Sequence, residues 1–130
     1  MIYTNVYDYI NVLDKAADAS WLRNKAIANN IANVDTPGYK RQDVDFEGAL
    51  KKAILNNRFV SVDDRVGAIT SDELEVGMYT DRSGYSYRLD GNNVDIETES
   101  AAMVSNQLKY QALMKAAGVE FANLRTAMSK

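Results

Sequence analysis

The sequence contains no cysteine and no histidine, and only one proline, in 130 residues. Without cysteine the chain cannot form a disulfide, a thiolate nucleophile or a thiolate metal site. Without histidine it also lacks the commonest general base and the commonest metal ligand. These absences exclude the commonest catalytic and metal-binding chemistry, and we expect no metal and no other cofactor.

The sequence also lacks an excess of basic residues and a long hydrophobic run. Its formal net charge is −3, so no basic surface for the phosphates of DNA or RNA is expected. The opening stretch MIYTNVYDYINVLDKAADAS has no basic start and no continuous apolar segment, unlike a secretory signal peptide or a membrane span. We expect a soluble chain without nucleic-acid partners that, if it is exported, leaves without cleavage of this end.

The glycines divide the chain into three segments. Six of the seven lie between Pro37 and Asp95, where they interrupt helices and strands, so that both ends are free to form long helices. The predicted division is an N-terminal helix at 1–34, a turn and polar middle segment at 35–94, and a C-terminal helix at 95–130. A chain of 14.5 kDa is about one domain long.

Both ends carry a heptad pattern, with apolar or small residues at alternating spacings of three and four. The first helix is predicted at 7–33 and the second at 96–128, with Asp95 as its N-cap. The predicted stripe of the first helix contains Ile10, Leu13, Ala17, Ser20, Asn24, Ile27 and Ile31, flanked by Trp21 and Ala28. The stripe of the second contains Met103, Gln107, Tyr110, Met114, Ala117, Phe121, Leu124 and Met128.

The middle segment has weaker signals. Short β character at residues 59–62 and 86–89, next to turn residues, predicts at most small β-hairpins. Its few apolar residues favour a segment that is loosely ordered or that orders only against a partner. The predicted fold is therefore mainly α, with long terminal helices packed as an antiparallel coiled coil and a polar, loosely ordered middle segment.

Such a pair of helices leaves apolar surface uncovered, because each helix buries a single stripe. The stripes also contain the polar positions Ser20, Asn24 and Gln107, which weaken an isolated pair. Both features favour helices that complete their burial against other subunits. We therefore expect an assembly component rather than a catalyst.

The stretch ANNIANVDTPGYKR, residues 28–41, places several amides at the predicted end of the first helix. Asparagine is a mediocre helix former, and the plain interpretation is a solvated, fraying helix end. However, Pro37-Gly38 suits the central positions of a type II turn, which gives the residues after it a fixed direction. Amides beside a directed turn favour side-on contacts between like subunits, through Asn29, Asn30 and Asn33.

Two other motifs fail as chemical sites. The stretch DGNNVDIETE has Asp95 where a calcium loop needs glycine and Ala101 where it needs glutamate. A turn leading into a helix N-cap is the better interpretation. The carboxylate pairs at 63–64 and 72–73 lie among polar turns, without the burying pocket that catalytic carboxylates need. No small-molecule substrate is therefore expected.

Two stretches resemble the signatures of the bacterial flagellar rod and hook family. ANNIANVDTPGYKR is similar to the N-terminal signature, and NNVDIETESAAMVSNQLKYQALMKAAG is similar to the C-terminal one. Other rod proteins typically continue Tyr110-Gln111-Ala112 with asparagine, whereas this chain has Leu113. That departure, the run RLDGNNVD and the short chain point to the proximal rod members of the family.

The resemblance implies a structural subunit of the flagellar basal-body rod, whose terminal helices pack as a coiled coil in a helical tube. The implied partners are copies of the chain, other rod subunits, the rod-base adaptor, the export gate and the membrane ring. The implied route to the periplasmic rod is the flagellar type III apparatus, without a cleaved signal peptide. The alternative is a cytosolic coiled-coil chaperone or adaptor for an export substrate. The residues expected at subunit interfaces are Ile10, Leu13, Trp21, Ile27, Asn29, Asn30, Ile31, Asn33, Thr36, Pro37, Gly38, Tyr39, Met103, Tyr110, Met114, Phe121, Leu124 and Met128.

Overall fold

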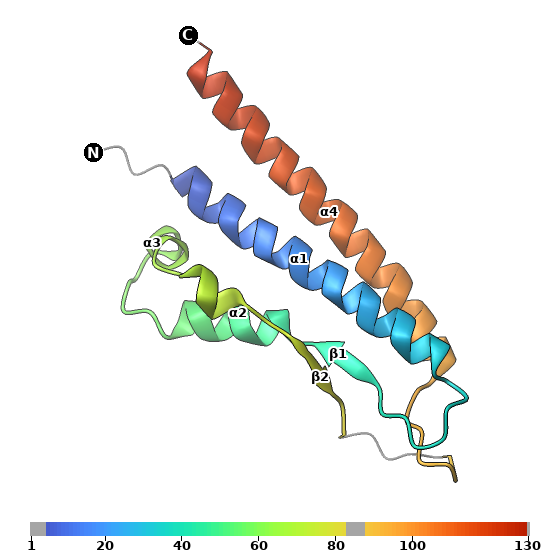
Figure 1. The fold of residues 1–130 in the computed structure, drawn as a ribbon. Coiled ribbons are helices and arrows are strands. Elements are labelled where there is room, and N and C mark those ends of the chain that lie inside the picture. Colours follow the sequence, from blue (N-terminus) through green and yellow to red (C-terminus); the bar gives the residue numbers. More distant parts are fainter. Residues whose placement is uncertain (1–4, 83–87, 130) are drawn as a thin grey trace.

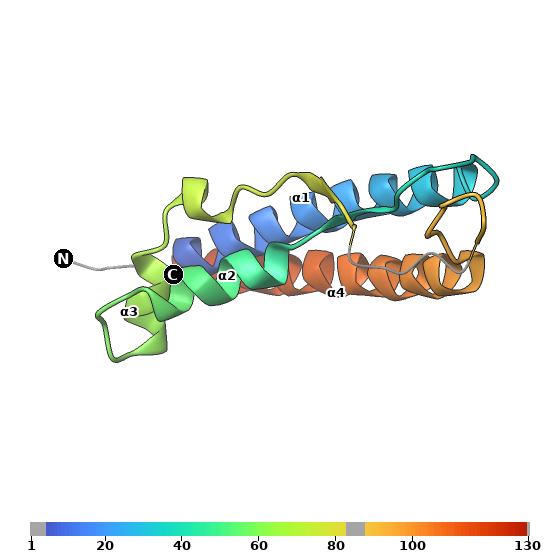
Figure 2. The ribbon, with the colours of Figure 1, turned by 90° about the horizontal axis from the view of Figure 1, so that it is seen from below.

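The computed structural model describes residues 5–82 and 88–129. Two long helices dominate it, α1 (Asn5–Ala32) and α4 (Ile96–Met128). They lie side by side and run in opposite directions, so that α1 begins at the end of the molecule where α4 finishes (Figures 1 and 2). The mainly helical fold and its two long terminal helices are therefore confirmed.

The start of α4 is capped by Asp95, as predicted. Its carboxylate accepts hydrogen bonds from the Glu97 N–H at 3.1 Å and from the Thr98 hydroxyl at 2.8 Å. The first of these bonds satisfies one of the N–H groups that a helix leaves free at its start. Together they lower the pKa of Asp95, and the bond from Thr98 contributes most.

The middle segment is more ordered than the sequence predicted. It contains β1 (Gln42–Val44), α2 (Phe46–Leu55), α3 (Val62–Gly67), the 3₁₀ helix η1 (Ser71–Leu74) and β2 (Met78–Thr80). Strands β1 and β2 pair antiparallel, with Asp43 opposite Tyr79, but three helices separate them in the chain and they do not form a hairpin. Of the two predicted hairpin strands, residues 59–62 lead into α3, and residues 86–89 lie partly outside the described residues.

A hydrophobic cluster explains this order. It joins Ala19 of α1, Val44 of β1, Phe46 and Ala53 of α2, and Leu74 of η1, all of which are buried. Because α1 packs against α4 on one side and against this cluster on another, the middle segment is anchored along the helix. Burial of apolar area at about 25 cal/mol per Å² favours this anchoring, and the prediction of a loosely ordered middle segment is wrong for the residues described.

The contact between α1 and α4 uses only part of the predicted stripe of α4, whose members Met103, Tyr110, Ala117 and Leu124 are half-buried. Asn106 is buried against α1, whereas the predicted Gln107 and Met114 are exposed. On α1, the predicted Ser20 and Ile27 are buried. At positions 107 and 114 the stripe of α4 is displaced by one residue, to Asn106 and the half-buried Leu113, and α1 offers polar partners to Asn106.

Candidate functional site

The turn that follows α1 has the predicted geometry. The Tyr39 N–H donates to the Thr36 carbonyl at 3.2 Å, and Gly38 has a φ of +72°. A type II turn requires a positive φ at this position, which glycine adopts without strain. The Thr36 hydroxyl also donates to the Asn33 side chain at 3.1 Å. The turn is therefore fixed to the end of the helix.

Asn30 is completely buried and joins this turn to β1 and α4. Its NH₂ group donates to the Gln42 carbonyl at 2.8 Å and to Glu99 Oε2 at 3.0 Å. Its oxygen accepts from the Gln42 N–H at 2.7 Å and from the Tyr39 hydroxyl at 3.2 Å. These four bonds use the full capacity of an amide. The structure therefore gives Asn30 a role inside its own chain, where the sequence predicted a role between subunits.

Asn92, in the loop before α4, holds the turn that follows α1. Its buried NH₂ group donates to the carbonyls of Asn33, Val34 and Thr36 at 2.9, 3.0 and 2.9 Å. These three carbonyls belong to the segment that follows α1, so Asn92 ties the loop before α4 to the turn. Asn92 was not among the predicted site residues; its only signal in the sequence is its place in the second signature.

Arg41 forms the charged centre of the site. Its guanidinium binds the buried Glu99 at 2.8 Å, Asp81 at 2.7 Å and Asp43 at 3.2 Å. Burial disfavours the charged form of Arg41 and so lowers its pKa. The hydrogen bonds to Glu99 and Asp81 have the opposite, larger effect, and the pKa of Arg41 is raised. The backbone N–H of Arg41 also donates to the side-chain oxygen of Asn93 at 2.7 Å. Asn30, Glu99, Arg41 and Asn93 are bonded in a chain, and we call these four residues together with Asn92 the polar clamp.

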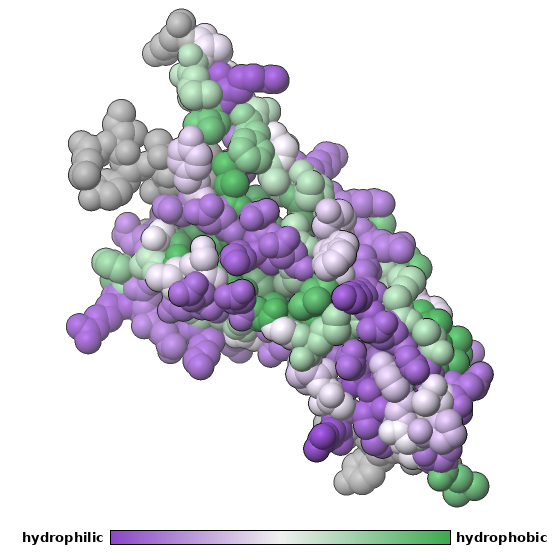
Figure 3. Space-filling view, in the orientation of Figure 1, coloured by the Kyte–Doolittle hydropathy of each residue, from purple (hydrophilic) through white to green (hydrophobic). Residues whose placement is uncertain are grey.

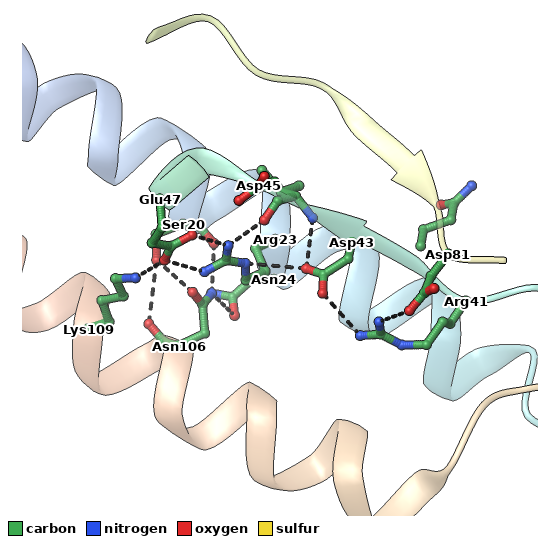
Figure 4. Close-up of polar contacts among 12 residues, drawn as sticks. Ser20, Arg23, Asn24, Arg41, Asp43, Asp45, Glu47, Asp81, Asn106 and Lys109 are labelled. Atoms are coloured by element: carbon green, nitrogen blue, oxygen red, sulfur yellow. Dashed lines mark hydrogen bonds and ion pairs between the residues drawn. The ribbon is translucent and has the colours of Figure 1, made fainter. Parts of the chain in front are cut away.

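A second buried polar group lies between α1 and α4 (Figure 4). The Ser20 hydroxyl donates to Asn106 Oδ1 at 3.1 Å, and the Asn106 NH₂ group donates to the Ser20 carbonyl at 2.7 Å and to Asn24 Oδ1 at 2.8 Å. Another alignment of the helices would leave these groups buried without partners. The layer of Ser20, Asn24 and Asn106 therefore fixes the register of the pair.

An ion-pair cluster ties α2 to both long helices (Figure 4). Glu47 of α2 binds Arg23 of α1 at 2.6 Å and also binds Lys109 of α4. The hydrogen bond from Arg23 holds the pKa of Glu47 well below its ordinary value; partial burial opposes this effect and Lys109 adds to it. Glu47 therefore stays ionised at neutral pH and links three elements.

We expect acid to destabilise the fold through Glu47. The pKa of Glu47 is lower in the folded chain than in the unfolded chain, so ionised Glu47 stabilises the fold at neutral pH. This stabilisation is lost as the pH falls below about 4 toward the folded pKa. Chemical denaturation of the parent and of Glu47→Gln, from about pH 6 to about pH 3, measures the difference. The parent should lose more stability over this range than the variant, and equal losses would contradict the assignment.

An open apolar groove of about 350 Å³ lies between α1 and α4. Its lining includes four residues that the sequence placed at subunit interfaces: Ile10, Leu13, Met114 and Phe121. Asn11, Asp14, Ala17, Leu113 and Ala117 complete the lining. This part of the predicted stripes therefore borders open space beside the helix contact.

The other predicted interface residues are distributed more widely. Trp21 and Met128 are 61% and 69% exposed, and hydrophobic side chains reach the surface over the long helices among hydrophilic ones (Figure 3). Asn29, Thr36, Pro37 and Gly38 are exposed near the turn, whereas Ile27 is buried. The half-buried members are Ile31, Asn33, Tyr39, Met103, Tyr110 and Leu124.

The arrangement is suited to contact with other proteins. Within residues 5–82 and 88–129, no three acidic, histidine or cysteine side chains gather to hold a metal ion. The buried carboxylate of Glu99 is bonded to Arg41 and Asn30. What the site offers is a rigid turn at one end of the helix pair and an uncovered apolar groove along its side.

Comparison with known proteins first defines the class. The family model described as "Flagella basal body rod protein" matches residues 10–40, which include most of α1, Asn30 and the turn. The chain is 33% identical over 128 residues to the flagellar basal body rod protein FlgB of Bacillus subtilis (strain 168), covering 92% of each chain. FlgB of Borrelia hermsii is 32% identical over 120 residues, covering 82% of this chain and 85% of the relative. FlgB of Escherichia coli (strain K12) is 33% identical over 101 residues, covering 72% and 73%.

The chain belongs to the FlgB family of flagellar basal body rod proteins. This confirms the predicted family and the predicted role as a structural rod subunit rather than an enzyme. It does not favour the alternative of a cytosolic chaperone or adaptor. Membership of this family supports a place in the basal body rod. No helix in the described part of the chain has the length and apolar character to span a membrane.

Proposed function

We propose that the chain polymerises as a rod subunit through the apolar groove between α1 and α4. The groove itself is the main support, because Ile10, Leu13 and Phe121 line it on the open side of the helix pair. Covering such surface is favourable by the hydrophobic effect, and an exposed apolar surface of this kind is typical of an interaction site. Since FlgB proteins are rod proteins by name, the partners are copies of the chain and other rod subunits.

The polar clamp gives the subunit a fixed shape in this assembly. It holds the turn against the start of α4, so that Asn29, Thr36 and Pro37 are presented at one end of the helix pair. A preformed turn loses less conformational freedom on association than a mobile one. These exposed residues therefore form the second contact with neighbouring subunits.

The family resemblance also implies how the subunit packs in the rod and where it lies. The helices pack as an antiparallel coiled coil in the tube, which the layer of Ser20, Asn24 and Asn106 supports, because single buried polar positions fix register in coiled coils. The subunit lies in the proximal rod, beside the rod-base adaptor, the export gate and the membrane ring. It is exported by the flagellar type III apparatus without a cleaved signal peptide. The similarity to FlgB proteins supports the place in the basal body rod.

Phe121→Ala should block rod assembly with little effect on the isolated chain. Phe121 is 54% exposed, so its truncation costs the monomer less than the about 3–5 kcal/mol lost for a fully buried phenylalanine. In the polymer the side chain is buried by a neighbouring subunit, so its truncation makes assembly less favourable. Motility and the yield of rods from a strain carrying the variant measure assembly, and chemical denaturation measures the stability of the purified chain.

Phe59→Ala is the matched control, because Phe59 is 50% exposed but lies in the loop between α2 and α3. It should leave rods and motility unchanged. Normal rods with Phe121→Ala, or an equal defect with Phe59→Ala, would count against the groove as the polymer interface.

A further inference from the structure

Helix α4 carries a second apolar surface, on the side turned away from α1. Val104, Leu108 and Val119 are 59%, 62% and 52% exposed. The helical period places them along one line of the helix, together with Lys115. We call these four residues the outer stripe. A helix with apolar residues on two opposite sides is typically buried on both sides. Helix α1 covers only one side of α4.

The groove and the outer stripe carry opposite charges. Asp14 lines the groove and is exposed, and Lys115 is exposed between Leu108 and Val119 on the stripe. Neither charged side chain forms an ion pair with another residue that the structure describes. Complementary charges on two surfaces steer their association and fix its register.

We infer that the outer stripe of one copy packs into the groove of the next copy, with Lys115 beside Asp14. The inference rests on the proposed function and names the surface that fills the groove. A helix face laid into an apolar groove is a recurrent mode of recognition. The stripe follows α4 and the groove runs between α4 and α1, so both surfaces are elongated along the helices.

The contact is head to tail, because the two surfaces are different. On α4, the groove residues Met114 and Phe121 lie about a third of a turn from the outer stripe. Joining the stripe of one copy to the groove of another leaves a free groove at one end and a free stripe at the other. Such a contact adds subunits into a filament or ring, whereas a groove that paired with a groove would close a dimer.

The absence of cysteine makes this contact testable by cross-linking. Full-length Asp14→Cys and Lys115→Cys chains are prepared separately, mixed in equal amounts and oxidised. The disulfide-linked dimer should be several times more abundant in the mixture than in either variant alone, because a disulfide requires Cα atoms within about 7 Å. Lys52→Cys, exposed on α2, replaces Lys115→Cys in the control mixture. A dimer formed by Asp14→Cys alone, or a yield equal to the control, would overturn the inference.

Charge reversal gives an independent measurement. Asp14→Lys and Lys115→Asp should each weaken self-association by about tenfold, because like charges then meet. The double variant should recover the parent value in sedimentation experiments over a range of concentrations. Failure of the single variants to weaken association, or of the double variant to restore it, would contradict the pairing of Asp14 with Lys115.

The proposed function is tested separately by the Phe121→Ala strain. If that strain builds no rods while copies of the chain neither cross-link nor respond to charge reversal, the groove binds another rod subunit. The inference then fails and the proposed function stands. If the Phe121→Ala strain builds normal rods, the proposed function itself fails.

Discussion

Arg41→Met is expected to lower the free energy of unfolding by about 3–5 kcal/mol, the range for removal of one partner of a buried ion pair. Glu99 is 1% exposed, and its carboxylate would keep only the amide of Asn30 as a side-chain donor. Folded proteins are stable by only about 5–15 kcal/mol, so the loss is a large fraction of the total. Chemical denaturation followed by circular dichroism measures it.

Two further variants separate the buried charge from other effects. Arg58 is exposed and forms no ion pair with the described residues, so Arg58→Met should change stability by less than about 0.5 kcal/mol. Arg41→Met combined with Glu99→Leu should recover much of the loss, because no uncompensated buried carboxylate remains. Parent-like stability of Arg41→Met alone would show that the ion pair does not hold the clamp.

The sequence predicted the features of the fold that depend on neighbouring residues. The predicted helix at 96–128 and its cap at Asp95 agree with α4, because periodicity and capping are local properties. The order of the middle segment depends instead on Ala19, Val44 and Leu74, which meet only in the folded chain. Short elements that each contribute one or two core residues leave no periodic pattern from which a core can be predicted.

The phase of α4 shows a related limit. Apolar residues occur on several sides of this helix, including Leu113 beside α1, Phe121 on the groove and Leu108 on the outer stripe. A pattern of apolar residues alone therefore does not decide which side faces α1. The deciding residue is polar, since Asn106 bonds to Ser20 and Asn24 across the pair.

The asparagines show how far the site could be predicted from the sequence. The sequence marked the amide-rich stretch correctly, but amides serve equally well within a chain and between chains. The structure separates them by environment, because Asn30 is buried among partners of its own chain and Asn29 is exposed. Two residues adjacent in the sequence therefore have different expected roles.

Asn30→Ala is expected to destabilise the isolated chain by about 3 kcal/mol, because each buried group left without a partner costs about 1–3 kcal/mol. The groups left without this partner are the N–H and carbonyl of Gln42 and the Tyr39 hydroxyl, whereas the Glu99 carboxylate keeps its bond to Arg41. Asn29→Ala is the matched control and should stabilise α1 by a few tenths of a kcal/mol, since alanine is the better helix former. Chemical denaturation of both purified variants measures the contrast, and equal effects of the two substitutions would contradict the clamp.

Rod assembly distinguishes the two asparagines further. Asn30→Ala should fail to build rods because the turn at Thr36 and Pro37 is no longer held against α4, and its defect should follow its loss of stability. Asn29→Ala should give a stable chain that nevertheless builds rods poorly, because the proposed contact of its exposed amide with a neighbouring subunit is lost. Motility and rod yield of the two strains, compared with the stabilities of the purified chains, test this. Normal rods with Asn29→Ala would assign that amide to the solvated surface and leave the turn and the groove as the contacts between subunits.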